Sequence, residues 1–218
     1  MRTLAAFLLL WPAVAAAQTP PGPDLPRGDV AGAVGWLHAP VDDLTTGFFR
    51  AGDWTRHATI AGTAGAYWTE HWKIEIAAEH SSTADVWDSE VVQVGRDSTQ
   101  RSVYHQVTFS RFSLAQFYQF GRNQWVHPSL GAGVVLLRRE IVTEYSPATL
   151  YRSDRGTAET IAPGERLPPR ATTVAAPMIA AAVKAYLTPR AFFRGDGQVA
   201  LRGGPDSVVF HAGFGFDF

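Results

Sequence analysis

The last eleven residues of the chain, 208–218, read VVFHAGFGFDF, and they decide the fold class. Two sets of side chains alternate along this stretch, namely Phe210, Ala212, Phe214, Phe216 and Phe218 on one face and His211, Gly213, Gly215 and Asp217 on the other. A repeat of two residues is typical of a β-strand. Chain ends are normally polar and poorly ordered, so a terminal row of aromatic side chains indicates a strand that faces an apolar environment.

This stretch resembles the closing strand of bacterial outer-membrane β-barrels, whose C-terminal phenylalanine is part of the signal read by the barrel-insertion machinery. The resemblance is carried by Phe218 and by the alternate aromatic residues Phe214 and Phe216. It implies a membrane-spanning barrel and makes the barrel-assembly machinery an expected partner of the C-terminal strand. The same pattern also suits a core strand of a periplasmic β-sandwich, so the rest of the chain has to decide.

The start of the chain has the features of a secretory signal peptide. Arg2 precedes an apolar run over residues 4–14, and Ala15 and Ala17 form an A-x-A cleavage site. The run is too short for a transmembrane helix, which needs about 20 residues. We therefore predict a signal peptide over residues 1–17, a proline-rich lead-in over 18–27, and an outer-membrane β-barrel domain over 28–218.

Composition limits the function classes. The chain has no cysteine, so it forms no disulfide and carries no lipid on a cleavage-site cysteine. A net charge of −1 gives no electrostatic basis for binding nucleic acid. The acidic pair Asp42 and Asp43 falls far short of a calcium shell, so we predict no metal and no cofactor. A mean hydropathy of −0.06 fits a barrel, because residues facing the lumen dilute those facing lipid.

Alternating polarity predicts an all-β fold, an eight-stranded antiparallel up-and-down transmembrane β-barrel. The expected strands cover residues 29–37, 54–68, 72–81, 101–120, 125–142, 172–187, 191–202 and 208–218. The third is the clearest, with Ile74 and Ile76 opposite Lys73 and Glu75. A change of phase near Ser110 predicts either a β-bulge or a strand whose upper half stands clear of the lipid. Pro177 predicts a bulge or a less regular upper part of its strand.

The connections alternate in length. Long loops are expected over 39–53, 82–100 and 144–170, and short turns over 69–71, 121–123 and 188–190. Short periplasmic turns and long extracellular loops are usual in outer-membrane barrels. This asymmetry places both termini on the periplasmic side.

Aromatic residues gather beside the short turns. We predict an interfacial girdle, formed by Trp68, Trp72, Trp125, Tyr186, Phe192 and Phe193. The whole mature chain, as a pattern, resembles the small eight-stranded bacterial outer-membrane barrels. That resemblance implies a monomer in the outer membrane of a Gram-negative bacterium, in contact with membrane lipid and lipopolysaccharide.

The inward positions of the predicted strands carry both signs of charge. They are Asp29, Lys73, Glu75, Glu79, Lys184, Arg194, Asp196, Arg202, His211 and Asp217. Side chains fill the interior of an eight-stranded barrel, and an unpaired charge there costs several kcal/mol. We expect a salt-bridged network that plugs the lumen, with a narrow ion or solute path as the alternative.

Two further functions remain open. Some eight-stranded outer-membrane barrels are lipid A acylhydrolases or acyltransferases built on His and Ser. His80 and Ser82 have the spacing of the His-x-Ser pair that the lipid A deacylase family carries on a strand. Glu79, however, falls on the opposite face, and no Asn follows Ser82, so we do not expect an enzyme. Basic residues of the third long loop could contact lipopolysaccharide phosphates, namely Arg138, Arg139, Arg152, Arg155, Arg166 and Arg170. The sequence thus predicts a structural or surface-exposed barrel with at most a narrow channel; the alternatives are an outer-leaflet lipid-modifying enzyme and a carrier of a small hydrophobic ligand.

Overall fold

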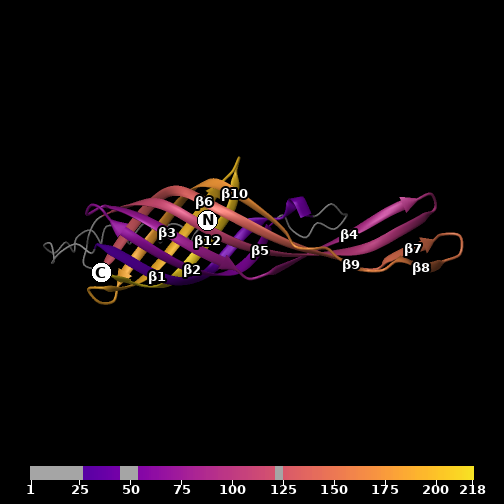
Figure 1. Ribbon diagram of the computed structural model, residues 1–218, viewed down its shortest axis with the longest axis horizontal. Helices are drawn as coiled ribbons and strands as arrows, with labels where there is room; N and C mark the ends of the chain where they lie inside the picture. Colours follow the sequence, from indigo (N-terminus) through magenta and orange to yellow (C-terminus); the bar gives the residue numbers. More distant parts are fainter. Residues whose placement is uncertain (1–26, 45–53, 121–124) are drawn as a thin grey trace, which may run out of the picture.

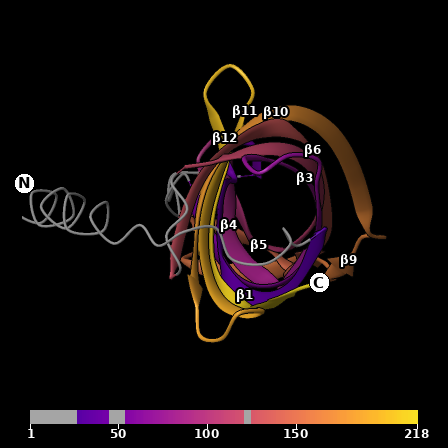
Figure 2. The same ribbon diagram turned by 90° about the vertical axis from the view of Figure 1, so that its left-hand side faces the viewer.

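The computed structural model describes residues 27–44, 54–120 and 125–218, and within these residues eight strands close into an antiparallel barrel. Around the barrel they are β1 (Gly28–Pro40), β2 (Trp54–Tyr67), β3 (Trp72–Ser81), β5 (Asp97–Gln119), β6 (Val126–Tyr145), β10 (Arg170–Tyr186), β11 (Ala191–Leu201) and β12 (Pro205–Asp217). Strand β12 pairs with β1 from Asp217 opposite Asp29 to Val208 opposite His38, which closes the ring seen in Figure 2. The predicted fold class is confirmed.

Polarity alternates along the strands as the sequence predicts. On β3, Ile74 and Ile76 face outward and are about half exposed, whereas Lys73, Glu75 and Glu79 face the lumen and are buried. Outward apolar side chains on β2, β5, β6, β10 and β12 continue this surface around the barrel. The barrel is therefore apolar outside and largely polar in the lower half of its lumen, the half nearest the short turns.

Two of the expected long loops contain β-structure. Strand β4 (Ala84–Val94) pairs with β5 along its whole length, and β7 (Ala148–Arg152) pairs with both β5 and β8 (Thr157–Ala162). The two-residue strand β9 (Glu165–Arg166) adds to the top of β6. Strands β4, β7 and β8 and residues 97–106 of β5, here called the arm, extend along the long axis of the barrel (Figure 1), and Val86 at the base of the arm packs into the top of the lumen.

Alternating polarity does not predict the strands of the arm, because much of the arm is exposed on both faces. Val91 and Val92 point to opposite faces of β4, and both are exposed. A strand with two wet faces does not have to alternate apolar and polar residues. The loops predicted over residues 82–100 and 144–170 are thus wrong for most of their length.

Strand β5 has no bulge. Its residues 103–119 pair with residues 145–129 of β6 without a register shift. Val107 and Phe109 face inward in phase with Arg111, and Phe112 faces outward. The change of phase in the sequence arises because the upper lumen is apolar. Inward side chains there are apolar rather than polar, while the strand itself keeps one regular alternation.

Pro177 lies in an uninterrupted ladder between β10 and β6, opposite Val134. The ladder between β10 and β11 begins only at Met178, so Pro177 lies beyond its end, where a missing N–H is tolerated. Of the two positions expected for Pro177, the bulge is absent, and the residue lies in the upper part of β10 beyond its ladder with β11. A register shift falls instead between Ala200 and Leu201, where β11 pairs with β12.

A short 3₁₀ turn, η1 (Asp42–Leu44), follows β1 at the upper end of the barrel. In the described part of the chain, no helix is long and apolar enough to cross a membrane. The predicted signal peptide, 1–17, lies outside the described residues and stays a prediction, as does nearly all of the lead-in, 18–27.

Candidate functional site: a chain of charges in the lumen

Ten ionisable side chains form one continuous chain of contacts through the lumen, with alternating acidic and basic members. We call it the charge chain. Each member is at most 8% exposed. In order from the lower end they are Asp217, Lys184, Asp29, Lys73, Glu75, Arg194, Asp196, His211, Glu79 and Arg111.

At the lower end the charge chain joins the two strands that close the barrel. Asp29 on β1 lies opposite Asp217 on β12. Lys184 Nζ, from β10, donates to Asp217 Oδ1 at 2.9 Å and to Asp29 Oδ2 at 2.5 Å. The hydroxyl of Tyr67 donates to Asp29, and that of Tyr186 donates to Asp217. One ammonium therefore binds carboxylates on both sides of the closing seam.

The middle of the charge chain crosses between β3 and β11. Lys73 Nζ donates to Asp29 Oδ2 at 2.9 Å and to Glu75 Oε2 at 2.5 Å. Arg194 then binds Glu75 with two parallel hydrogen bonds, Nη1–Oε2 at 2.6 Å and Nη2–Oε1 at 2.7 Å, while its Nε donates to Asp196 at 3.0 Å. Bidentate guanidinium–carboxylate pairs are among the strongest and most directional ionic contacts.

The upper end runs from β12 to β5. His211 Nδ1 lies 3.1 Å from Asp196 Oδ1, and its Nε2 lies 3.5 Å from Glu79 Oε1. Arg111 Nη1 donates to Glu79 Oε2 at 2.5 Å. Because burial of an ion costs several kcal/mol unless a partner and hydrogen bonds offset it, the strict alternation of sign is what allows so many charges in one lumen.

Above the charge chain the lumen is filled by apolar side chains. This upper core consists of Leu37, Ala39, Val41, Val86, Val107, Phe109, Leu137, Ile141 and Val209, all buried. Leu44 of η1 packs against it. At its rim Arg139 binds Asp43 bidentately, at 2.8 and 2.5 Å, and these hydrogen bonds hold the pKa of the Asp43 carboxyl below its usual value. Two successive buried layers thus occupy the lumen.

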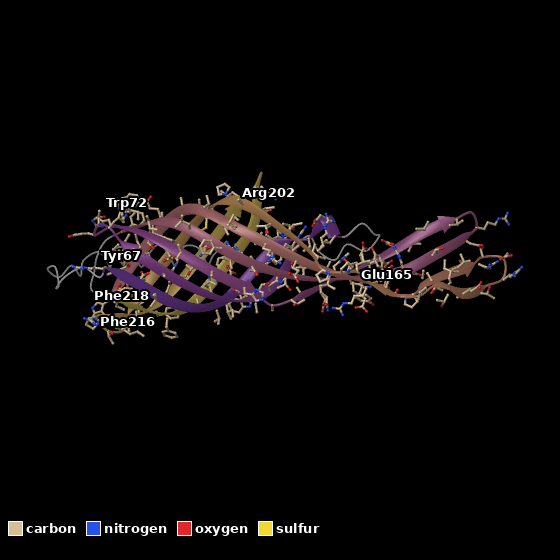
Figure 3. All side chains as sticks on the ribbon, in the orientation of Figure 1. Tyr67, Trp72, Glu165, Arg202, Phe216 and Phe218 are labelled. Carbon is tan, nitrogen blue, oxygen red and sulfur yellow. The ribbon has the colours of Figure 1, made fainter. Side chains whose placement is uncertain are left out.

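One residue assigned to the inward network lies elsewhere. Arg202 is exposed on the outer side of the barrel (Figure 3). It follows the end of β11 and the register shift at Ala200, and its N–H donates to the carbonyl of Gly204 in the turn. The even-numbered positions of β11 face inward only while the regular ladder lasts, so the prediction for Arg202 was wrong.

Sequence reasoning missed Arg111 and the hydroxyl groups of Tyr67 and Tyr186. The phase change near Ser110 leaves the face of Arg111 undetermined in the sequence. Unbroken alternation back from outward Phe112 would have placed it in the lumen. Tyr67 precedes outward Trp68, so strand alternation alone would have placed it in the lumen.

The aromatic rim at the lower end is formed by a different set of residues than predicted. Trp68, Trp72, Trp125 and Phe193 are exposed on the outer surface. Phe192 is only 1% exposed, with Lys184 Nζ 4.0 Å from its ring centroid, and Tyr186 turns its hydroxyl to the lumen. Neighbouring residues on a strand take opposite faces, so Phe192 and Phe193 could not both face outward.

The three C-terminal phenylalanines expected to form the insertion signal do face outward. Phe214, Phe216 and Phe218 are each exposed, and Figure 3 shows the last two at the same end of the barrel as Trp72. Their place is consistent with an outward row read by an insertion factor, but recognition by such a factor stays a prediction.

The structure does not bring His80 and Ser82 together as a catalytic pair. His80 Nδ1 lies 3.0 Å from Ser110 Oγ on the outer face of β3 and β5, while Ser82 Oγ accepts the N–H of Ala58. In the described residues no carboxylate contacts the ring of His80, so the pair lacks the acid that orients a catalytic histidine.

No family model matches the chain, and no curated protein matches it significantly. Among solved structures it is similar to Neisserial surface protein A, with a TM-score of 0.52 over 88% of this chain and 96% of that one, at 11% identity. The fold is that of a small outer-membrane β-barrel. The N-terminal β-barrel domain of Pseudomonas aeruginosa OprF matches with a TM-score of 0.48, 17% identity and coverage of 88% and 98%. At such identities the likeness concerns the fold alone.

Proposed function

We propose that the protein is a monomeric barrel of the outer membrane of a Gram-negative bacterium, that its lumen is blocked, and that its role is to hold the arm at the cell surface. The observation that carries this proposal is the filling of the lumen by the charge chain and the upper core. A barrel that cannot pass solute has to act through the parts that it exposes outside the membrane, here the arm.

The outer surface supports a place in the membrane. Between the aromatic rim below and His80, Ser110 and Arg138 above, it exposes large apolar side chains. They include Ile60, Ile74, Ile76, Phe112, Leu114, Leu130, Val134, Leu136, Ile179 and Phe210. A monomeric soluble protein rarely exposes a continuous apolar surface of this extent, whereas a lipid-facing band flanked by aromatic residues is typical of outer-membrane barrels.

The arm has the features of a recognition surface. Among the described strands β4 pairs with β5 alone, so its other edge leaves backbone N–H and C=O groups unpaired within the sheet. Such an edge is a template for an extended segment of a partner. Strand β5 runs without a break from the lower rim into the arm, so the barrel supports the arm as one continuous strand. Arg138 and Arg170 are exposed, which supports the proposal that they contact lipopolysaccharide phosphates.

The other functions have less support. Beside the charge chain lies a small cavity, lined in part by Lys73, Gln119, Lys184 and Arg194. The cavity has room for about one water molecule, which is too little for a hydrophobic ligand. His80 contacts Ser110 and Ser82 contacts the backbone of Ala58, so the His-x-Ser motif gives a deacylase little support.

A blocked lumen predicts electrical silence. In planar bilayers in concentrated KCl, the purified, folded protein should add no stable conductance steps above the baseline. The control is a known open porin reconstituted in the same way. Reproducible unitary currents from the folded protein would favour the narrow channel and contradict the blocked lumen.

The absence of native cysteine allows a direct test of location and orientation. Val92→Cys places a thiol on the exposed part of the arm, and Glu70→Cys places one in the exposed turn between β2 and β3. On intact cells a membrane-impermeant maleimide should label residue 92 and not residue 70; both should react after the outer membrane is permeabilised. Labelling of residue 70 alone would mean that the barrel has the opposite orientation. Labelling of neither residue on intact cells would mean that the arm does not lie at the cell surface.

A further inference from the structure

His211 lies between two carboxylates that come from different walls of the barrel. Asp196 on β11 faces its Nδ1 at 3.1 Å, and Glu79 on β3 faces its Nε2 at 3.5 Å. A neutral imidazole has one N–H, whereas the imidazolium has two. Both contacts are therefore attractive only while the ring carries its second proton. Among the described residues, Asp196 and Glu79 are the charged groups in contact with His211. Arg194 in turn binds Asp196, and Arg111 binds Glu79.

Arg111 has donors in reserve. Its Nη1 binds Glu79, but Nε and Nη2 are buried without a hydrogen-bond partner. Glu79 Oε1 and His211 Nε2 are also buried and form no hydrogen bond, because their contact is long. An unsatisfied buried donor is costly, and the Nε–Nη2 edge of a guanidinium can bind a carboxylate with two parallel bonds.

The local packing holds the histidine more firmly than the glutamate. A Cβ at Gly35 would lie 2.6 Å from His211 Cδ2 and 2.0 Å from the carbonyl oxygen of Phe210, so the ring is seated directly on the wall of β1. The shorter contact of the ring, to Asp196, is within hydrogen-bonding distance. Glu79 has three side-chain torsions and an unpaired oxygen, so it is the member that can change partner.

We propose that Glu79 is a proton-operated joint in the charge chain, which bridges His211 and Arg111 while the imidazole is charged and turns wholly to Arg111 once the ring is neutral. As the pH rises through the titration of His211, Nε2 loses its hydrogen and presents a lone pair to Glu79 Oε1. The carboxylate then gains more from the unused donors of Arg111. As the pH falls, the bridge forms again.

The joint connects β12 across the lumen to β3 and β5. Strand β5 is the strand that continues into the arm, and β3 is followed by β4. When the joint opens, the charge chain divides into the eight members from Asp217 to His211 and the pair Glu79–Arg111. Lys73 and Glu75 keep β3 tied to the closing seam in both states. Protonation of one histidine thereby sets whether β12 is also joined, through Glu79, to Arg111 on the strand that continues into the arm.

The test is nuclear magnetic resonance of the full-length protein in lipid nanodiscs, with labelled histidine, arginine and glutamate side chains. On the acid side of the His211 transition both of its ring nitrogens should be protonated. Across the transition one should lose its proton, and the signals of the Glu79 carboxylate and of Arg111 Nε should shift over the same pH interval. His57 is the internal control, because among the described residues its ring contacts Ser82 O and Thr55 Oγ1 and no carboxylate.

Two variants separate the joint from a general effect of pH. In His211→Gln the side chain is uncharged at every pH and does not titrate, so the Glu79 and Arg111 signals should hold their alkaline positions at every pH. In Arg111→Lys the guanidinium edge is gone, so His211 should still titrate while the Glu79 shift is lost. Glu79 and Arg111 signals that stay fixed while wild-type His211 titrates would overturn the proposal without any variant.

Discussion

Replacement of Arg194 by Met should destabilise the barrel by about 3–5 kcal/mol, the usual cost of removing one partner from a buried ion pair. Arg194 holds both oxygens of Glu75 and one of Asp196, and it is only 2% exposed. Methionine fills similar space but leaves two carboxylates in the lumen without this cation. Reversible urea unfolding in lipid vesicles, followed by tryptophan fluorescence, would measure the loss.

Arg202→Met is the matched control, because it makes the same chemical change at an exposed position outside the charge chain. It should alter the free energy of unfolding by no more than about 0.5 kcal/mol. The double variant Arg194→Met, Glu75→Met should recover part of the single-variant loss, since it removes one of the stranded carboxylates. Equal effects of Arg194→Met and Arg202→Met would show that the charge chain does not hold the lumen together.

The barrel could be predicted from the sequence because membrane strands obey two constraints at once. Each strand must satisfy its backbone hydrogen bonds in a closed ladder, and its outward face must be apolar. Ile74 and Ile76 opposite Lys73 and Glu75 therefore give the orientation of β3 without any tertiary information. The final strand gives the same answer through Phe214 and Phe216.

The prediction failed where one of these constraints is absent. The arm has water on both faces, so Val91 and Val92 can both be exposed and polarity does not report a strand. The upper lumen is packed with apolar side chains, so Val107 and Phe109 look outward-facing in a polarity pattern although they are buried. The order of partners in the charge chain also could not be foreseen, because it depends on which side chains meet across the lumen rather than on any one strand.

Replacement of Ile74 by Arg should cost about 2–4 kcal/mol if the outer face of β3 lies near the middle of a bilayer. Ile74 is 45% exposed and flanked outward by Trp72 and Ile76, so nothing in the protein itself opposes an arginine there. The penalty would arise almost wholly from lipid, which makes its size a measure of the surroundings rather than of packing. Urea unfolding of the variant and of the wild type in vesicles would give the difference in their free energies of unfolding.

The matched control is Val92→Arg on the arm, where the side chain is 57% exposed. In water an exposed substitution of this kind changes stability by no more than about 0.5 kcal/mol, so a membrane barrel predicts a large difference between the two sites. A water-soluble barrel predicts none, because Ile74 and Val92 would then meet the same solvent. The direction of the effect on solubility also differs between the two cases. If the apolar outer face met water, Ile74→Arg should improve the solubility of the protein. Small and equal losses of unfolding free energy in both variants would therefore mean that the outer face of β3 meets water. That result would contradict the proposed location in a membrane and would leave the fold unchanged.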